Sequence, residues 1–221
     1  MQLPDVELLC GARGHLPLLN KLELIILDHP DSILGHEFLP RTVCDLFNDA
    51  PLLTHVALRE ISDWHFNWQS LSILDLDDIP EVDEDTVVFD ALRETINSIK
   101  LTVGGTFSRD WADVEVSKHE FIHLRHLKYL SLYGTEPLIA LEAPALQRLK
   151  IEFFGHGDTN LGDAGRIVAF LCRSRPRLDT FVTDRAEGAS IKEVLPYMSD
   201  IENLIMRRTQ GPGDVFKWLG E

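Results

Sequence analysis

A short apolar pattern recurs along the whole chain and constrains its fold more than any other feature. The pattern is L-x-x-L-x-L, in which other apolar residues can replace leucine and one polar residue is tolerated at the last position. The last two apolar residues alternate with an intervening residue, as in a short strand with one buried face. Eight matches occur, at Leu19/Leu22/Leu24, Leu53/Val56/Leu58, Leu71/Leu74/Leu76, Ile96/Ile99/Leu101, Leu127/Leu130/Leu132, Leu146/Leu149/Ile151, Leu178/Phe181/Thr183 and Ile201/Leu204/Met206.

The spacing of these matches predicts the fold class. Their first residues are 18 to 34 residues apart, about 26 on average, which lies within the range of leucine-rich repeats. A single unit cannot bury its apolar edge, so we expect the units to stack side by side. The prediction is an α/β, irregular, right-handed leucine-rich-repeat solenoid with about eight short parallel strands, and with helices and loops on its convex side.

One domain is expected over residues 1–221, because the length and the hydrophobic content are enough for one continuous core without a second domain. Residues 1–15 are predicted to form a thin N-terminal cap, 16–210 the repeats and 211–221 a C-terminal capping helix. The alternative is a doubly wound α/β domain, in which short apolar runs also alternate with helices. Against it, no glycine-rich phosphate-binding loop follows any of the runs.

Helical periodicity is clear in three of the longer intervals between matches. The 18- and 19-residue intervals are too short for an α-helix and should return through extended or turn backbone. The predicted helix faces consist of Leu39, Val43, Leu46 and Phe47; of Ile167, Val168, Leu171 and Cys172; and of Ile191, Val194, Leu195 and Met198.

The charge balance excludes some classes of partner. A formal net charge of -15 repels phosphate backbones and anionic membranes, so neither nucleic acid nor membrane is expected to bind. Cys10, Cys44 and Cys172 form no paired spacing, which fits a reducing, intracellular setting, either cytoplasmic or nuclear. No signal peptide or membrane-spanning stretch is recognisable. A monomer that binds another protein is the expectation.

Three segments, residues 50–58, 68–76 and 143–151, follow the patterns A-P-x-L-x-x-v-x-L and W-x-x-L-x-x-L-x-L. In these patterns the chain resembles, over about residues 16–210, the leucine-rich portion of F-box proteins from mushroom-forming fungi. The resemblance implies substrate recognition for a cullin-type ubiquitin ligase. The F-box, a helical module that docks the ligase adaptor, has no room before the first match, so adaptor binding by this chain is not expected.

One catalytic motif occurs in the sequence. Residues 119–123 read H-E-x-x-H, so on a helix His119 and His123 could bind zinc while Glu120 serves as general base. The competing interpretation is a solvated helical turn, because Lys118 and His126 depart from zinc-protease patterns and the following residues lead directly into a strand. We therefore expect no catalytic residue, metal or cofactor, and keep a zinc-dependent hydrolase as the alternative.

An acidic run and two tryptophans are the candidate binding residues. The run could hold calcium, but it lacks the glycine and the final glutamate of an EF-hand loop. As an acidic rim it would attract a basic partner protein. Trp68 is expected in the core and Trp64 partly exposed. The predicted partner-binding residues are Trp64, Asp77, Asp78, Glu81, Asp83, Glu84 and Asp85, in a run that begins at Asp75.

Overall fold

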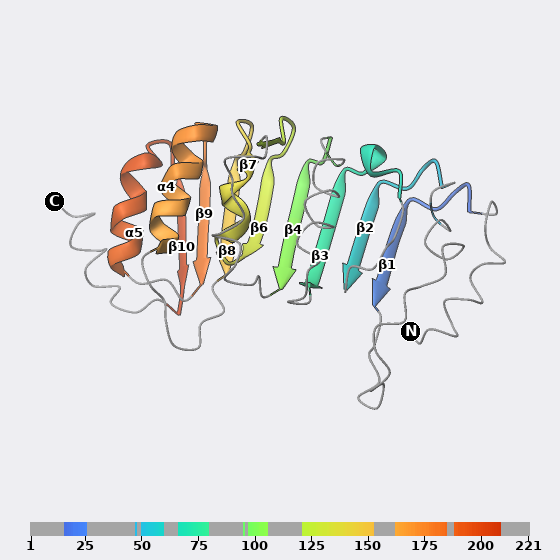
Figure 1. The fold of residues 1–221 in the computed structure, drawn as a ribbon, viewed down its shortest axis with the longest axis horizontal. Coiled ribbons are helices and arrows are strands. Elements are labelled where there is room, and N and C mark those ends of the chain that lie inside the picture. The colour runs from blue at the N-terminus through green and yellow to red at the C-terminus, as the bar shows by residue number, and fades with distance from the viewer. Residues whose placement is uncertain are drawn as a thin grey trace, which may run out of the picture.

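A parallel sheet of eight strands runs the length of the molecule (Figure 1). The computed structural model describes residues 16–25, 47, 50–59, 66–79, 95, 97–105, 121–152, 162–184 and 188–208. The strands are β1 (Lys21–Ile25), β2 (His55–Arg59), β3 (Ile73–Ile79), β4 (Lys100–Gly105), β6 (Tyr129–Tyr133), β8 (Arg148–Glu152), β9 (Thr180–Asp184) and β10 (Asn203–Arg207). The predicted α/β class with about eight parallel strands is confirmed.

The order of these strands across the sheet follows their order in the sequence. A doubly wound sheet reverses its strand order at a switch point, where its ligands bind. No such reversal occurs among the eight described strands, so the structure does not support the doubly wound alternative. A second, two-stranded parallel sheet joins β5 (Ile122–His123) to β7 (Leu141–Glu142).

The register of the sheet brings the apolar residues of successive matches side by side. Most of them are buried, and those in the middle strands are completely buried. Because one face of each strand enters this core, the period of two seen in the sequence fixes which residues point inward. The two rows are Leu22, Val56, Leu74, Leu101, Leu130, Leu149, Phe181 and Leu204, and Leu24, Leu58, Leu76, Val103, Leu132, Ile151, Thr183 and Met206.

Most strands are entered through the same backbone geometry. A turn precedes the strand in these units, and its last residue stands three positions before the first inward residue of the strand. In seven of the eight units, the N–H of that turn residue donates to the carbonyl oxygen of the residue three positions before it. At all seven junctions between strands, one carbonyl oxygen accepts two N–H groups of the next unit at 2.8–3.2 Å. These oxygens belong to Asn20, Thr54, Ser72, Ile99, Lys128, Gln147 and Asp179. Stacking therefore satisfies polar groups that a lone unit would leave unpaired.

The fourth match is the one whose register was predicted wrongly. The structure places Ser98, Leu101 and Val103 at its three inward positions, two residues later than the predicted Ile96/Ile99/Leu101. Ile99 is 46% exposed, whereas Ser98 is buried and its hydroxyl donates to the carbonyl oxygen of Leu71 at 3.3 Å. A hydroxyl satisfied by the neighbouring unit can replace an apolar residue, which an apolar pattern cannot detect.

Two helical segments cover the C-terminal part of one sheet face (Figure 1). In α4 (Gly162–Ser174), Ile167 and Leu171 are buried as predicted and Val168 is half-buried. Cys172 is exposed, contrary to prediction, and Phe170 is buried in its place. The turn of 100° per residue puts position 170, rather than 172, on the face of 167 and 171.

The second segment is α5 (Gly188–Val194), which continues as η6 (Leu195–Tyr197). All four predicted inward residues, Ile191, Val194, Leu195 and Met198, are buried. The α-helix ends where Pro196 removes a backbone donor. None of the described helices is long and apolar enough to cross a membrane.

The described residues of the two short intervals contain no α-helix, as predicted. The 19-residue interval from Leu127 to Leu146 is fully described and, after the strand β6, holds only η5 (Glu136–Ile139) and β7. The described part of the 18-residue interval holds η2 (Trp68–Ser70). The predicted helix near Leu39–Phe47, apart from the buried Phe47, lies outside the described residues, as do both predicted caps.

Candidate functional site

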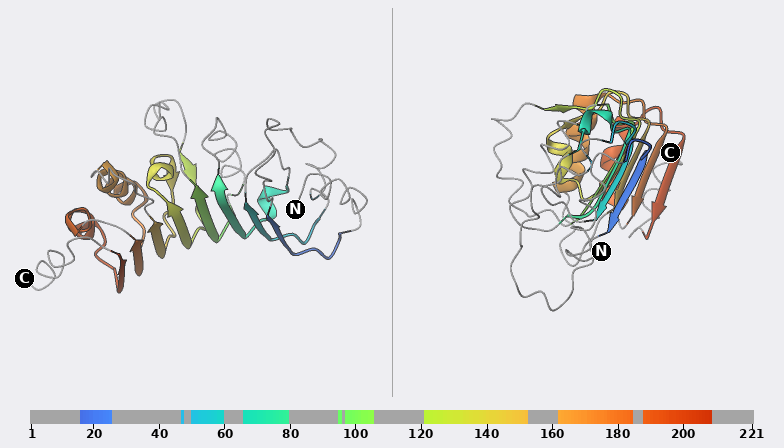
Figure 2. Two further views of the ribbon diagram at one scale, coloured as in Figure 1. Left: turned by 90° about the horizontal axis from the view of Figure 1, so that it is seen from below. Right: turned by 90° about the vertical axis from the view of Figure 1, so that its right-hand side faces the viewer.

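One face of the eight-stranded sheet faces away from every described helix. Viewed along its edge, the sheet follows a shallow arc with the helices on the convex side (Figure 2). Outward residues alternate with buried ones along most strands, although Ser131 of β6 and Thr180 and Val182 of β9 are buried at outward positions. We call the surface made by these outward residues the open face. Its first row is Lys21, His55, Ile73, Lys100, Tyr129, Arg148, Thr180 and Asn203, and its middle row is Glu23, Ala57, Asp75, Thr102, Ser131, Lys150, Val182 and Ile205.

Three side chains of the first row form a cationic cluster on the middle strands of the open face, at the residues where these strands begin: Lys100, Tyr129 and Arg148. They come from the neighbouring strands β4, β6 and β8. The ammonium nitrogen of Lys100 lies 5.3 Å from the centroid of the Tyr129 ring, and the guanidinium carbon of Arg148 also lies 5.3 Å from it. Both distances are typical of cation–π contacts, so the ring holds two positive groups in defined positions.

The two cations of the cluster have no carboxylate partner in the part of the chain that the structure describes. Lys150, farther along β8 on the same face, forms an ion pair with Glu152. The outward positions of these three strands therefore carry more positive than negative charge, although the whole chain has a formal net charge of -15.

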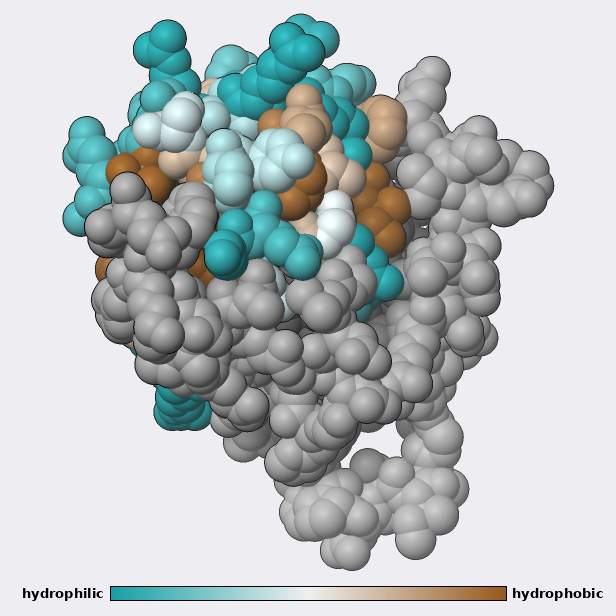
Figure 3. Space-filling view, turned by 90° about the vertical axis from the view of Figure 1, so that its left-hand side faces the viewer, coloured by the Kyte–Doolittle hydropathy of each residue, from teal (hydrophilic) through white to brown (hydrophobic). Residues whose placement is uncertain are grey.

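The C-terminal end of the sheet offers a weaker candidate surface. At β10, Ile205 is 37% exposed, and Tyr197 of η6 is 51% exposed. Figure 3 shows apolar and polar residues interspersed at this end of the molecule. Isolated exposed apolar side chains are usual on soluble proteins and do not by themselves mark a binding site.

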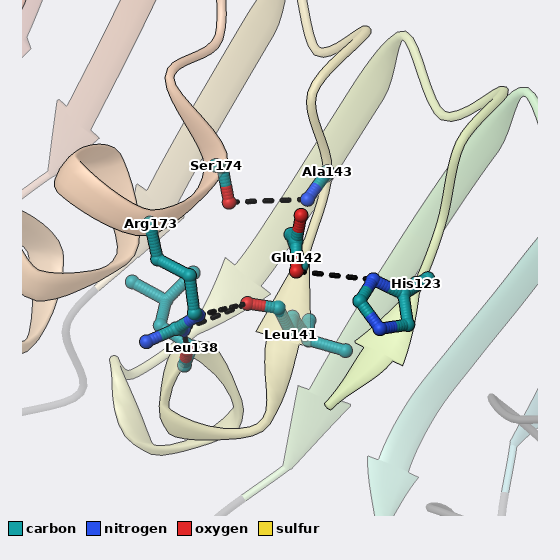
Figure 4. Close-up of polar contacts among 7 residues, drawn as sticks. All are labelled: His123, Leu138, Leu141, Glu142, Ala143, Arg173 and Ser174. Carbon is teal, nitrogen blue, oxygen red and sulfur yellow. Dashed lines mark hydrogen bonds and ion pairs between the residues drawn. The ribbon is translucent and has the colours of Figure 1, made fainter. Parts of the chain in front are cut away.

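A polar network on the helix side fixes α4 to the segment around β7 (Figure 4). Arg173 donates to the carbonyl oxygen of Leu138 at 2.6 Å and to that of Leu141, and its guanidinium lies 4.4 Å from the ring centroid of Phe121. Burial lowers the pKa of Arg173, and the nearby Glu142 carboxylate partly opposes that shift. The Ser174 hydroxyl accepts the N–H of Ala143 at 3.1 Å.

The described half of the H-E-x-x-H motif is not helical. His123 lies in β5, where its Nδ1 is 3.0 Å from Oε2 of Glu142 (Figure 4). The predicted helical turn is therefore wrong at Ile122–His123, while His119 and Glu120 lie outside the described residues. Within the described ranges, no group of three or more His, Cys, Asp or Glu side chains could hold a metal ion.

No protein-family model matches the chain, and neither a curated protein nor a solved structure matches it significantly.

The predicted partner-binding residues fall largely outside the described part of the chain. Asp77 and Asp78 belong to β3, where Asp77 pairs in register with Arg59. The remaining five, Trp64, Glu81, Asp83, Glu84 and Asp85, lie outside the described residues. Trp68 packs against the core as predicted, with its ring centroid 5.1 Å from that of Phe66 in an edge-on contact.

The sequence analysis did not identify the cationic cluster. Lys100, Tyr129 and Arg148 are far apart in the chain and match no motif. A signal was nevertheless available, because in a stacked sheet the same position of successive matches forms one row. In each match, the residue just before the second apolar residue of the pattern belongs to this row. Listing that residue for all eight matches would have given Tyr129 and Arg148, and also Lys100 once the register of the fourth match was corrected.

Proposed function

We propose that this chain is an irregular leucine-rich-repeat solenoid that binds another protein through its open face and performs no catalysis. The observation that carries the proposal is the combination of sequential parallel strands with the same hydrogen-bonded turn and junction in successive units. Stacked units of this kind are typical of solenoids, in which each repeat contacts only its neighbours. A right-handed path follows from the handedness of nearly all crossovers between parallel strands.

The exposure of one sheet face supports a binding role. Parallel sheets are ordinarily covered by helices on both faces. Here all described helices lie on one side of the sheet (Figure 2). The opposite face presents charged, hydroxyl and aromatic side chains in a regular array, although the outward residues Thr180 and Val182 of β9 and Ser131 of β6 are buried. Solenoid proteins use extended concave surfaces of this kind to bind other proteins.

The class of partner follows from charge and from the resemblance. The net charge of -15 disfavours nucleic acid and anionic membranes. The likeness of residues 50–58, 68–76 and 143–151 to the leucine-rich portion of fungal F-box proteins supports substrate recognition for a ubiquitin ligase. The zinc-hydrolase alternative would require His119 and His123 on one helix, but His123 lies in a strand.

The test compares two bulky substitutions on opposite sides of the sheet. Thr102→Trp blocks the middle of the open face without changing charge, and Ala169→Trp adds the same bulk to the exposed side of α4. The tagged variants and the unmodified chain would be purified from cells with the proteasome blocked, and the proteins that accompany each would be quantified by mass spectrometry.

We expect a saturable partner that accompanies the unmodified chain and Ala169→Trp but is lost from Thr102→Trp. A partner retained equally by both variants would refute binding through the open face. Circular dichroism and thermal melting of both variants would show that the loss does not come from unfolding.

A further inference from the structure

We propose that the cationic cluster of Lys100, Tyr129 and Arg148 is the site that anchors an acidic segment of the partner protein through its carboxylate side chains. This inference rests on the proposed function and specifies the chemistry of its partner. It differs from the expectation drawn from the acidic run, which concerns residues 75–85 and a basic partner. The cluster lies three to five strands from the N-terminal edge of the sheet, on the open face itself.

The first argument is local charge. Lys100 and Arg148 lack carboxylate partners among the described residues, although the chain contains 36 acidic residues and 21 basic ones. In such a chain, neighbouring acidic side chains would readily neutralise a surface cation. Two cations on either side of β6, with no carboxylate partner among the described residues, create a local positive potential that an incoming carboxylate can complement.

The second argument is preorganisation. Tyr129 lies on the strand between the other two, and each cation is 5.3 Å from its ring. These contacts restrict two long, flexible side chains before a partner arrives. Less side-chain entropy is then lost on binding, which increases affinity.

The third argument concerns the form of the anion. Lys100 and Arg148 come from strands on either side of β6, and two strand spacings amount to about 10 Å. This is the separation of the backbone positions from which the two side chains emerge. It is comparable to the distance between carboxylates two to three residues apart in an extended peptide, which rises about 3.3 Å per residue. The arrangement therefore favours several carboxylates on one segment over a single compact anion.

The net charge of the chain restricts which acidic partners can bind. A formal charge of -15 repels a strongly acidic protein at long range, and the repulsion is weaker where salt screens it. The partner should therefore carry a short acidic segment within an otherwise weakly charged surface. When this acidic segment contacts the cluster, its attraction to the two nearby cations outweighs its repulsion by the more distant carboxylates of the chain.

The experiment titrates the full-length, 15N-labelled chain with acetylated hexaglutamate and follows its backbone amide signals by NMR. Hexaglutamine serves as a neutral peptide of equal length, and inorganic phosphate as a compact anion. The test variant is Lys100→Gln/Arg148→Gln. The control variant is Lys192→Gln, which removes one exposed lysine from α5 on the other side of the sheet. Thermal melting confirms that both variants fold.

We expect hexaglutamate, but not hexaglutamine, to shift the signals of β4, β6 and β8. The double variant should weaken this binding about fivefold, and Lys192→Gln should leave it unchanged. Shifts elsewhere, equal binding by the double variant, or shifts of the same strands by phosphate alone would overturn the assignment. The two proposals can fail separately. If Thr102→Trp abolishes partner binding but the double variant does not affect it, the partner still binds the open face, and the acidic anchor is refuted.

Discussion

The guanidinium group of Arg173 donates two hydrogen bonds to the carbonyl oxygen of Leu141, from Nε at 3.1 Å and from Nη2 at 2.7 Å. Arg173 stands in the last turn of α4, and Leu141 begins β7. The same side chain also reaches the carbonyl oxygen of Leu138. One planar, multiply donating group therefore connects the helix to the return segment of the preceding unit.

Arg173→Ala should lower the free energy of unfolding by about 2–3 kcal/mol, because charged hydrogen bonds are lost and two carbonyl oxygens lose a donor. Arg173→Lys should recover only part of this loss, since an ammonium group lacks the planar fork of donors. Urea denaturation followed by circular dichroism measures both. The control is Arg177→Ala at an exposed position, and an effect as large as that of Arg173→Ala would contradict the assignment.

Ser174→Ala should also destabilise the chain, by about 1–3 kcal/mol. The substitution removes the acceptor of the buried Ala143 N–H and leaves that donor unpaired. The same denaturation experiment tests it, with Ser199→Ala at an exposed site as the control. Equal, small changes in the two variants would show that the hydrogen bond contributes nothing.

Thr183→Val should stabilise the chain by about 1 kcal/mol. Thr183 occupies an inward position beside Ile151 and Met206, and none of the described residues hydrogen-bonds its buried hydroxyl. Valine keeps the branched shape and removes the unsatisfied oxygen. A rise in the urea midpoint at unchanged slope would confirm this, whereas a fall would mean that the hydroxyl has a partner that the described contacts do not include.

Two glycines should respond to alanine with opposite signs. Gly134 has a φ of +87°, a backbone conformation that residues with a Cβ rarely adopt, so Gly134→Ala should cost about 1–2 kcal/mol. Gly165 lies within α4 with open space around its α-carbon, so Gly165→Ala should add about 0.5–1 kcal/mol. Thermal melting of the two variants gives the signs, and matching signs would refute this account.

Protein purified without added metal should contain much less than one zinc per chain, and His123→Ala should leave the zinc content unchanged. The reason is that His123 lies in a strand and pairs with Glu142. The zinc site would instead need His123 on a helix, on the same face as His119. Elemental analysis of both proteins is the measurement. One tightly held zinc per chain that disappears on His123→Ala would favour the hydrolase interpretation instead.

The sequence by itself determined where most strands begin and which side of each is buried. In seven of the eight matches the predicted inward residues are the observed ones, as with Leu130/Leu132 and Leu149/Ile151. The inward faces of α4 and α5 were largely readable for the same reason. Burial of apolar surface is the dominant favourable term in folding, and the periods of strand and helix translate it directly into sequence spacing.

The tertiary structure decided what depends on neighbouring units. Ser98 can be buried only because Leu71 of the adjacent unit offers it a carbonyl oxygen. Lys100, Tyr129 and Arg148 meet only because β4, β6 and β8 lie next to one another in that register. A polar residue at an outward position stays in contact with water and costs no desolvation free energy, so no apolar period marks these positions. Their grouping into a binding surface arises from the order and alignment of strands that the chain separates by many residues.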